Sequence, residues 1–510
     1  MSTRKLFIIL SCVIIALLAG TGVYSDDYSF ILHQESKASF IEAFELSNSF
    51  LSLPFEQVTH VIFYYFCTEE SYWLLNVMKI FYVIACLHMC ARFFSLFMEE
   101  KRALLISFLF IFYPSHEATV YWFLSQYLMV TISMYLYAYY LLEKKHKGYA
   151  LAFAIMGSFI SYGSPAPAIA LTFLAWRKMS WRESLILYVP NFVYTLYYLY
   201  TTKIMNVGIQ RIPEGTGFVH LCKQVLMQIL SCIDALMGPS FFLKLYYSYQ
   251  ESFILTLLVS LICIVLYKYR KKISCCTEMK IKLDKDLLLA LVLIMCISFG
   301  MFAITGRYPN IAFNLGNRTN IFSCLVLVYG LSFLNNKKFY LVFACLFISI
   351  VGISFHWKKW TQIQDDSLEA MKSSLANYQG SKTLYFVGHQ YSEMGSIDHI
   401  ELFSGDWVVN PMLKLTCGDK YTAYPLNHNY RLKGNDYIDI RYNTLVSTVD
   451  DKITVYDVEK RQLFDLERDA INTYIESCDK PKRHWTQLLG EGFIRDSILK
   501  LMPRLKYAFE

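Results

Sequence analysis

Long apolar runs separated by short polar and charged stretches dominate residues 1 to 356. A helix of about twenty apolar residues crosses the hydrocarbon layer of a bilayer, so each sufficiently long run predicts one span. The runs lie at roughly 6 to 24, 73 to 93, 103 to 113 with its neighbours, 119 to 142, 149 to 163, 165 to 176, 183 to 203, 251 to 268, 286 to 305, 319 to 335 and 338 to 356. The pattern predicts a mostly α-helical, polytopic membrane protein of about eleven spans.

Loop charge gives an independent test of this order, because Lys and Arg favour cytoplasmic loops. With the N-terminus inside, basic clusters fall on the inner side at every crossing. These clusters are Arg92, Lys101 and Arg102; Lys144, Lys145 and Lys147; Arg177, Lys178 and Arg182; residues 268 to 285; and Lys337 with Lys338. The first apolar run also resembles a secretory signal, and we interpret it as a retained anchor because many further apolar runs follow.

Two outer stretches, about 25 to 72 and 217 to 248, carry apolar residues of their own. Between residues 40 and 53, apolar positions alternate with acids such as Glu42, which favours a helix lying in the membrane interface. The second stretch holds Asp234 within apolar sequence. Two such helices would cover a cavity at the bilayer surface, and ordinary lipid-facing loop helices are an equally good interpretation of each.

The pattern changes after residue 357, where charged and polar residues become frequent. It predicts helices at 360 to 378 and 469 to 507, and strands at 383 to 387, 437 to 441 and 453 to 458. We therefore expect a transmembrane domain over 1 to 356. A mixed α/β domain over 357 to 510 would follow it on the extracytoplasmic side.

Composition agrees with this class: the 510 residues are 55% hydrophobic and 17% charged, with a positive mean hydropathy of +0.34. The 14 cysteines show no zinc-site spacing. We expect no metal, no cofactor and no nucleic-acid partner. Cys417 and Cys478, in the polar C-terminal part, could pair outside the cytoplasm or remain buried thiols.

The first candidate chemistry lies directly after the first apolar run, at Asp26 and Asp27. Ionisable groups at the membrane edge of a cavity are costly to desolvate and are therefore candidates for function. One of these carboxylates could act as a general base on a hydroxyl group, with its pKa set by the other acid or by a nearby cation. The alternative is that they merely end the first helix.

A second candidate is the outer turn from Tyr113 to Trp122, followed by Gln126. Pro114 and Ser115 would end one helix and cap the next, which places His116 and Glu117 at a helix start near the membrane surface. Glu117, His116, Trp122 and Gln126 are candidate substrate-binding residues. A plain polar turn and cap is the alternative.

Arginines supply the third candidate group, in the sequences Gly306-Arg307-Tyr308-Pro309 and Gly316-Asn317-Arg318-Thr319. Guanidinium groups suit bidentate contact with phosphate, so Arg307 and Arg318 could bind a phosphorylated lipid. Binding of ordinary lipid headgroups is the alternative for each.

Together these features resemble the GT-C class of integral-membrane glycosyltransferases, in particular protein O-mannosyltransferases and bacterial enzymes that use polyprenyl-phosphate sugars. The resemblance rests on the acidic pair after the first span, the outer Pro-x-His-Glu-Ala-x-x-x-Trp turn and an Arg-bearing loop before a late span. It covers residues 1 to 356. The acidic motif here is Ser25-Asp26-Asp27-Tyr28, where the mannosyltransferases usually carry Asp-Glu, so the resemblance leaves open which carboxylate is the base.

The resemblance implies an inverting transfer from a polyprenyl-phosphate sugar donor to a glycan, lipid or protein acceptor, on the extracytoplasmic face of a bacterial inner membrane. Asp26 or Asp27 would deprotonate the acceptor hydroxyl, and an arginine would stabilise the leaving lipid phosphate. The arginines in this role would be Arg318, or Arg307 or Arg211 as alternates; His116 and Glu117 would orient the acceptor or the acid.

Other functions are not excluded by the sequence. Asp284-Lys285-Asp286 matches the DxD motif of nucleotide-sugar transferases, but it lies on the inner side and more simply begins a charged helix. A transporter or flippase of a lipid-linked glycan is the main alternative, although no inverted halves match. A non-catalytic membrane protein whose outer domain binds a partner is the third.

Overall fold

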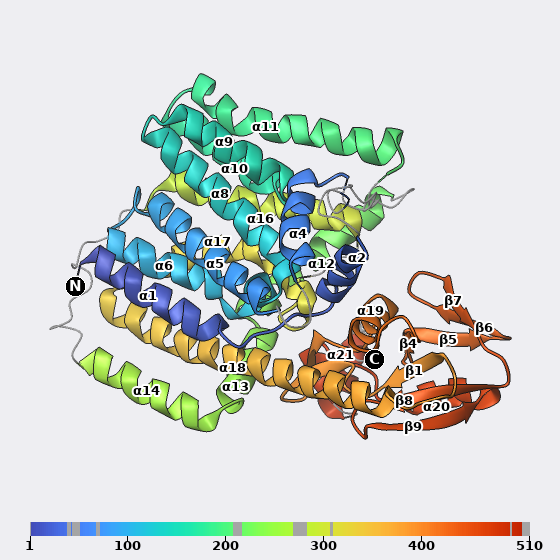
Figure 1. The fold of residues 1–510 in the computed structure, drawn as a ribbon. Helices are drawn as coiled ribbons and strands as arrows, with labels where there is room; N and C mark the ends of the chain where they lie inside the picture. Colours follow the sequence, from blue (N-terminus) through green and yellow to red (C-terminus); the bar gives the residue numbers. More distant parts are fainter. Residues whose placement is uncertain are drawn as a thin grey trace. The chain divides into compact units, whose positions relative to one another are not determined.

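The computed structural model describes residues 2–37, 42, 51–67, 72–207, 217–268, 283–306, 310–489 and 492–501. The chain divides into two compact units (Figure 1). The helical unit comprises Met1–Ala19, Ser39–Phe63 and Leu74–His356. The sheet unit comprises Gly20–Ala38, Tyr64–Trp73 and Trp357–Glu510, so two segments from the N-terminal region group with the C-terminal residues.

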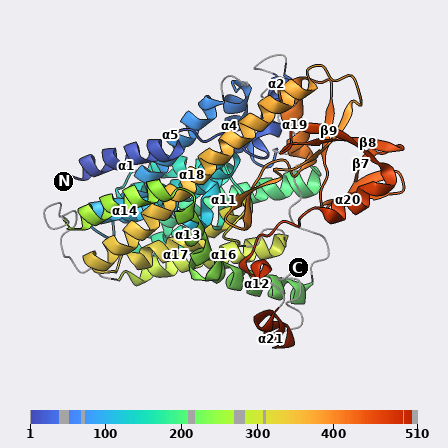
Figure 2. The same ribbon diagram turned by 90° about the horizontal axis from the view of Figure 1, so that it is seen from below.

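The helical unit is built almost entirely from helices that run side by side (Figures 1 and 2). Its elements are α1 (Thr3–Leu18), α4 (Pro54–Tyr65), α5 (Trp73–Phe94), α6 (Glu100–Phe112), η3 (Pro114–His116), α7 (Ala118–Tyr121), η4 (Phe123–Ser125), α8 (Gln126–Glu143), α9 (Lys147–Phe159), α10 (Pro165–Lys178), α11 (Trp181–Leu199), the π-helix η5 (Tyr200–Ile204), α12 (Phe218–Met237), α13 (Pro239–Gln250), α14 (Phe253–Lys268), α16 (Lys285–Thr305), η6 (Leu315–Asn320), α17 (Ile321–Leu331) and the first part of α18 (Asn336–Leu375). The prediction of a mostly helical chain is therefore confirmed.

Within the part of the chain that the structure describes, four helices are long and apolar enough to cross a membrane: Trp73–Phe94, Phe218–Gln250, Lys285–Thr305 and Asn336–Leu375. Large apolar side chains on other helices are also exposed, such as Phe253 at 75% and Ile254 at 74%. Exposing such apolar side chains to water costs free energy, whereas exposing them to the hydrocarbon of a bilayer does not. The protein is thus a membrane protein by its helices, and the count of about eleven spans stays a prediction.

Several predicted segments differ in detail from the observed ones. The apolar run to residue 24 is helical only to Leu18, and Gly20, at a φ of 80°, follows in the left-handed conformation that commonly ends helices. The expected span from 119 is interrupted at Trp122, and its continuous helix begins at Gln126. The stretch expected in the membrane interface, 217 to 248, forms α12 and α13, which together are long and apolar enough to span. Most of 40 to 53 lies outside the described residues.

Close backbone contact inside the helical unit involves Gly352 of α18. A Cβ added there would lie 1.9 Å from the carbonyl oxygen of Ser248 on α13, so only glycine fits. One turn away, the hydroxyl groups of Ser248 and Ser349 are 2.7 Å apart and share a hydrogen bond. Small residues that allow helix backbones to approach, joined by interhelical hydroxyl bonds, are typical of packing in membranes.

The sheet unit contains a four-stranded sheet of order β4-β1-β8-β9, in which β4, β1 and β8 are parallel and β9 is antiparallel to β8. β2 and β3 form a hairpin, and β5, β6 and β7 a three-stranded antiparallel sheet. The strands are β1 (Thr383–Val387), β2 (Tyr391–Met394), β3 (Ile397–Glu401), β4 (Thr422–Pro425), β5 (Tyr430–Lys433), β6 (Asp436–Asp439), β7 (Thr444–Thr448), β8 (Lys452–Asp457) and β9 (Gln462–Glu467). The helices are α2 (Asp27–Glu35), the C-terminal part of α18, α19 (Asp406–Cys417), η7 (Arg468–Ala470), α20 (Ile471–Ser477), η8 (Trp485–Leu488) and α21 (Phe493–Leu501).

Strands β1 and β8 are buried along almost their whole length, because both faces of a parallel strand are covered. Their side chains Tyr385, Val387 and Val455 pack with Ile471 and Ile475 of α20 in the core. The strands expected at 383 to 387 and 453 to 458 are confirmed. The helix expected over 469 to 507 is wrong in extent: it divides into α20, η8 and α21, and Pro481 lies in the first break.

Candidate functional site

The segment that carries Asp26 and Asp27 is fixed within the sheet unit by its own backbone and by the C-terminal part of α18. Thr361 accepts a hydrogen bond at 3.0 Å from the backbone N–H of Gly22. Gln364 donates to the carbonyl oxygen of Val23 at 3.0 Å. Ser25, at a φ of 49°, turns the chain into α2, whose first residue is Asp27. The two acids therefore stand at a helix N-terminus, where the helix dipole favours negative charge.

The two neighbouring carboxylates have different surroundings. Asp27 is 1% exposed. Its Oδ1 accepts a 2.6 Å hydrogen bond from the hydroxyl of the buried Tyr64, and its Oδ2 accepts one at 3.3 Å from the backbone N–H of Tyr24. Asp26 is partly exposed, and its Oδ1 accepts a hydrogen bond at 2.8 Å from the indole Nε1 of Trp407. Asp27 is therefore held by the protein, and Asp26 is the carboxylate that a solvent-borne hydroxyl can approach.

Aromatic and basic side chains surround this indole. The guanidinium of Arg441 lies over the ring of Trp407 at 4.8 Å, and Tyr442 meets the same ring edge-on at 6.1 Å. Arg441 also forms a 2.6 Å ion pair with Asp439, which is buried. Sequence reasoning missed Trp407, Arg441 and Tyr442, because no local pattern near residue 407 or 441 shows proximity to residue 26.

The turn with His116 and Glu117 is buried in the helical unit. Glu117 Oε1 forms a 2.6 Å ion pair with Lys244 of α13, whose side chain is fully buried and also donates to the carbonyl oxygen of Ala312. His116 Nδ1 lies 3.0 Å from the hydroxyl of Thr119. Burial lowers the pKa of His116 to about 4, which keeps the imidazole neutral at physiological pH.

The polar turn that the sequence indicated is present, but its predicted cap is not. Ser115 makes no capping hydrogen bond, and its hydroxyl instead donates to the carbonyl oxygen of Ala235 on α12. Gln126 is buried and donates to the carbonyl oxygen of Val120 at 2.7 Å. The turn is thus shaped by contacts with distant helices more than by a local cap.

Segment 310 to 320 is hydrogen-bonded to this turn, so the structure does bring Arg318 close to it. Asn317 accepts from the backbone N–H of Ala118 at 3.2 Å, and Asn320 donates to the carbonyl oxygen of Ser115 at 2.7 Å. The guanidinium of Arg318 lies 4.9 Å from the ring centre of Trp122 and is partly exposed. His116, Glu117, Trp122, Gln126 and Arg318 therefore form one neighbourhood.

Arg211 and Arg307 lie outside the described residues, and Asp26 and Asp27 belong to the sheet unit. Lys244 was not among the candidates from the sequence, although its position between apolar neighbours in residues 239 to 245 is the signal of a buried cation. Asp284 accepts a hydrogen bond from the backbone N–H of Leu287 at the start of α16, as expected for a charged helix start.

Cysteine and metal chemistry receive no support in the described ranges. Cys417 and Cys478 form no disulfide there. Within the same ranges, no group of three or more His, Cys, Asp or Glu side chains could hold a metal ion.

No protein-family model, curated protein or solved structure matches this chain.

Proposed function

We propose that this protein is an inverting glycosyltransferase that moves a sugar from a polyprenyl-phosphate donor to a hydroxyl-bearing acceptor. The observation that carries the proposal is the partly exposed carboxylate of Asp26, oriented by the indole of Trp407 at the start of α2. A general base must be both accessible and held in one orientation, and Asp26 meets both conditions. The membrane character of the helical unit suits a donor that is itself a lipid.

In the proposed reaction, Asp26 takes the proton of the acceptor hydroxyl. The oxygen of that hydroxyl attacks the anomeric carbon of the donor sugar at the same time. The bond between that carbon and the phosphate oxygen breaks, and the polyprenyl phosphate leaves with an added negative charge. Arg318, with Arg307 or Arg211 as alternates, stabilises this charge. The buried Asp27 fixes the segment around Asp26 through Tyr64 and Tyr24.

The protein would cross the membrane with its catalytic acids on the outer side. The N-terminus would lie in the cytoplasm, about eleven spans would cross the membrane, and the acids and the sheet unit would face the outer side of a bacterial inner membrane. The donor would then be a sugar already carried across the bilayer, since nucleotide sugars are cytoplasmic.

Reconstitution tests the proposal directly. Purified protein in proteoliposomes is given a panel of radiolabelled polyprenyl-phosphate hexoses and envelope glycolipids, and new glycosidic bonds are detected by mass spectrometry. We expect Asp26→Asn to lower transfer by about 100-fold or more. Glu35→Gln, an exposed carboxylate at the end of the same helix, is the matched control and should transfer normally.

Two results would contradict this function. One is full transfer by Asp26→Asn. The other is movement of the lipid-linked sugar between leaflets with no new glycosidic bond, which would identify a flippase.

A further inference from the structure

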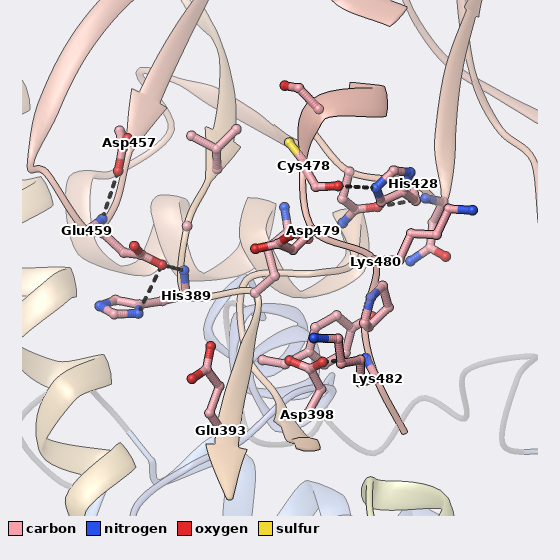
Figure 3. Close-up of a pocket in the computed structure, with 18 of the residues that line it drawn as sticks. His389, Glu393, Asp398, His428, Asp457, Glu459, Cys478, Asp479, Lys480 and Lys482 are labelled. Atoms are coloured by element: carbon pink, nitrogen blue, oxygen red, sulfur yellow. Dashed lines mark hydrogen bonds and ion pairs between the residues drawn. The ribbon is translucent and has the colours of Figure 1, made fainter. Parts of the chain in front are cut away.

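The sheet unit contains an open cavity of about 670 Å³ at the carboxyl ends of its parallel strands (Figure 3). Val387 ends β1 and Asp457 ends β8, and residues that directly follow each strand line the cavity, as does Asn427 beyond the end of β4. Loops at the carboxyl edge of parallel strands converge, and α/β sheets commonly bind their ligands there. The position alone makes this cavity a candidate binding site.

The wall after β1 has an unusual backbone that its neighbours hold in place. Gly388 and His389 both have positive φ, at 79° and 41°. The backbone N–H of His389 donates to Glu459 Oε1 at 2.9 Å, and the ring of His389 meets that of Trp360 edge-on at 5.6 Å. A Cβ at Gly388 would lie 2.9 Å from Glu459 Cγ. Backbone in such conformations persists where the surroundings over-determine it, and it concentrates at ligand sites.

Some lining carboxylates shape the wall. Asp457 Oδ1 accepts hydrogen bonds from the backbone N–H groups of Glu459 and Lys460, at 3.1 and 2.9 Å. Asp398 Oδ2 accepts one from the backbone N–H of Lys482. Glu393 and Asp479, in contrast, are exposed at the cavity, and Figure 3 shows both among the side chains around it. These two carboxylates are available to a ligand.

The charge of the lining selects against anions. Five carboxylates line the cavity, from Glu393, Asp398, Asp457, Glu459 and Asp479. The lining lysines are Lys460, Lys480 and Lys482, so acids outnumber them by two. A phosphate or nucleotide would meet net repulsion here.

Hydroxyl groups, in contrast, match this chemistry. Carboxylates accept hydrogen bonds from hydroxyl groups, and lysines donate to hydroxyl oxygens. The side-chain amides of Asn and Gln can do both. The aromatic rings of Trp360, Tyr391 and Tyr474 also line the cavity and offer faces for the C–H surface of a sugar ring.

We propose that this cavity binds a neutral glycan, with Glu393 and Asp479 accepting hydrogen bonds from its hydroxyl groups. Binding here requires no turnover, so the proposal stands apart from the transferase function. Where both hold, the bound glycan is a candidate acceptor.

The test uses the full chain in detergent micelles on an array of defined neutral and acidic oligosaccharides, with inorganic pyrophosphate as an anionic probe. We expect binding of neutral oligosaccharides and none of pyrophosphate. The double variant Glu393→Gln/Asp479→Asn should weaken glycan binding by about 10-fold or more, since both carboxylates lose acceptor strength. Asp419→Asn, an exposed acid of the sheet unit at 86% side-chain exposure and outside the cavity lining, is the matched control and should bind as wild type.

The proposal fails if wild type binds no neutral glycan, if pyrophosphate binds in preference, or if the double variant binds undiminished. Asp26→Asn is measured in parallel and should bind glycan normally while it loses transfer. Transfer by a wild-type protein that binds no array glycan would overturn only this proposal, whereas glycan binding without any glycosidic bond formation would overturn only the transferase.

Discussion

The acid in the turn of the helical unit and the first acid of the sheet unit are held in contrasting ways. Glu117 is 2% exposed and paired with the fully buried Lys244. Asp26 is partly exposed, and its Oδ1 accepts hydrogen bonds from the Trp407 indole at 2.8 Å and from the Ser25 hydroxyl at 3.3 Å. A buried ion pair has lost its water and has little freedom to exchange protons with a substrate, whereas an oriented, accessible carboxylate keeps that freedom. We therefore propose a structural role for Glu117 and a chemical role for Asp26, and four changes test that division.

Removing the cation of the buried pair should have the largest effect. Lys244→Met leaves the Glu117 carboxylate without its ion-pair cation in a low-dielectric interior, which typically costs about 3–5 kcal/mol. We expect a strongly lowered melting temperature in detergent. Lys223→Met, an exposed lysine of α12, should melt as wild type. Restoration of stability by Glu117→Leu/Lys244→Met would sharpen the assignment, and an unchanged melting temperature for Lys244→Met alone would contradict it.

Asp26→Asn should act in the opposite way. Its melting temperature should change little, because the side chain is partly exposed and the amide oxygen of Asn still accepts from Trp407 and Ser25, so the change costs about 1 kcal/mol at most. Its sugar transfer should fall by about 100-fold or more. Melting curves and transfer rates are measured for both Asp26→Asn and Lys244→Met. The first variant should lose transfer but little stability, and the second should lose stability. A large loss of stability in Asp26→Asn would place this acid with the structural ones.

Tyr64→Phe tests the neighbouring acid. It removes the 2.6 Å hydrogen bond to Asp27 without changing the packed ring. Hydrogen bonds to buried charged groups are worth about 1.5–3 kcal/mol, so we expect a clear fall in melting temperature. Tyr246→Phe, with a side chain 55% exposed, is the control. If Tyr64→Phe instead left stability intact and abolished transfer, Asp27 would be the better candidate for the base.

The smallest effect should follow Trp407→Phe. Phenylalanine keeps an aromatic ring but cannot donate to Asp26, so the carboxylate keeps its charge and loses the shorter of its two side-chain hydrogen bonds, the longer being from Ser25. We expect transfer to fall by roughly 10-fold, as for loss of one positioning hydrogen bond, with the acceptor KM nearly unchanged. Kinetics across acceptor concentrations measure this. A rise in KM alone would mean that Trp407 contacts the acceptor directly.

Much of the secondary structure was predictable because hydrophobic runs report burial locally. The apolar stretch at 286 to 305 is α16, and the strand patterns at 383 to 387 and 453 to 458, the latter an alternating one, are the central parallel strands β1 and β8. Ends were less predictable: the first apolar run continues to residue 24, but the helix stops at Leu18, and residues 20 to 38 group with the sheet unit. Local hydrophobicity carries no information about which distant segment covers a residue.

By itself, the sequence determined the membrane character, the helical majority and the candidate acids, since these depend on residue type and short-range periodicity. Only the tertiary structure decided which acid is enclosed and which is accessible. Asp26 and Trp407 are 381 residues apart in the chain, and Glu117 and Lys244 are 127 apart. The environment of a carboxylate depends on such long-range partners, and these exist only once the chain has folded.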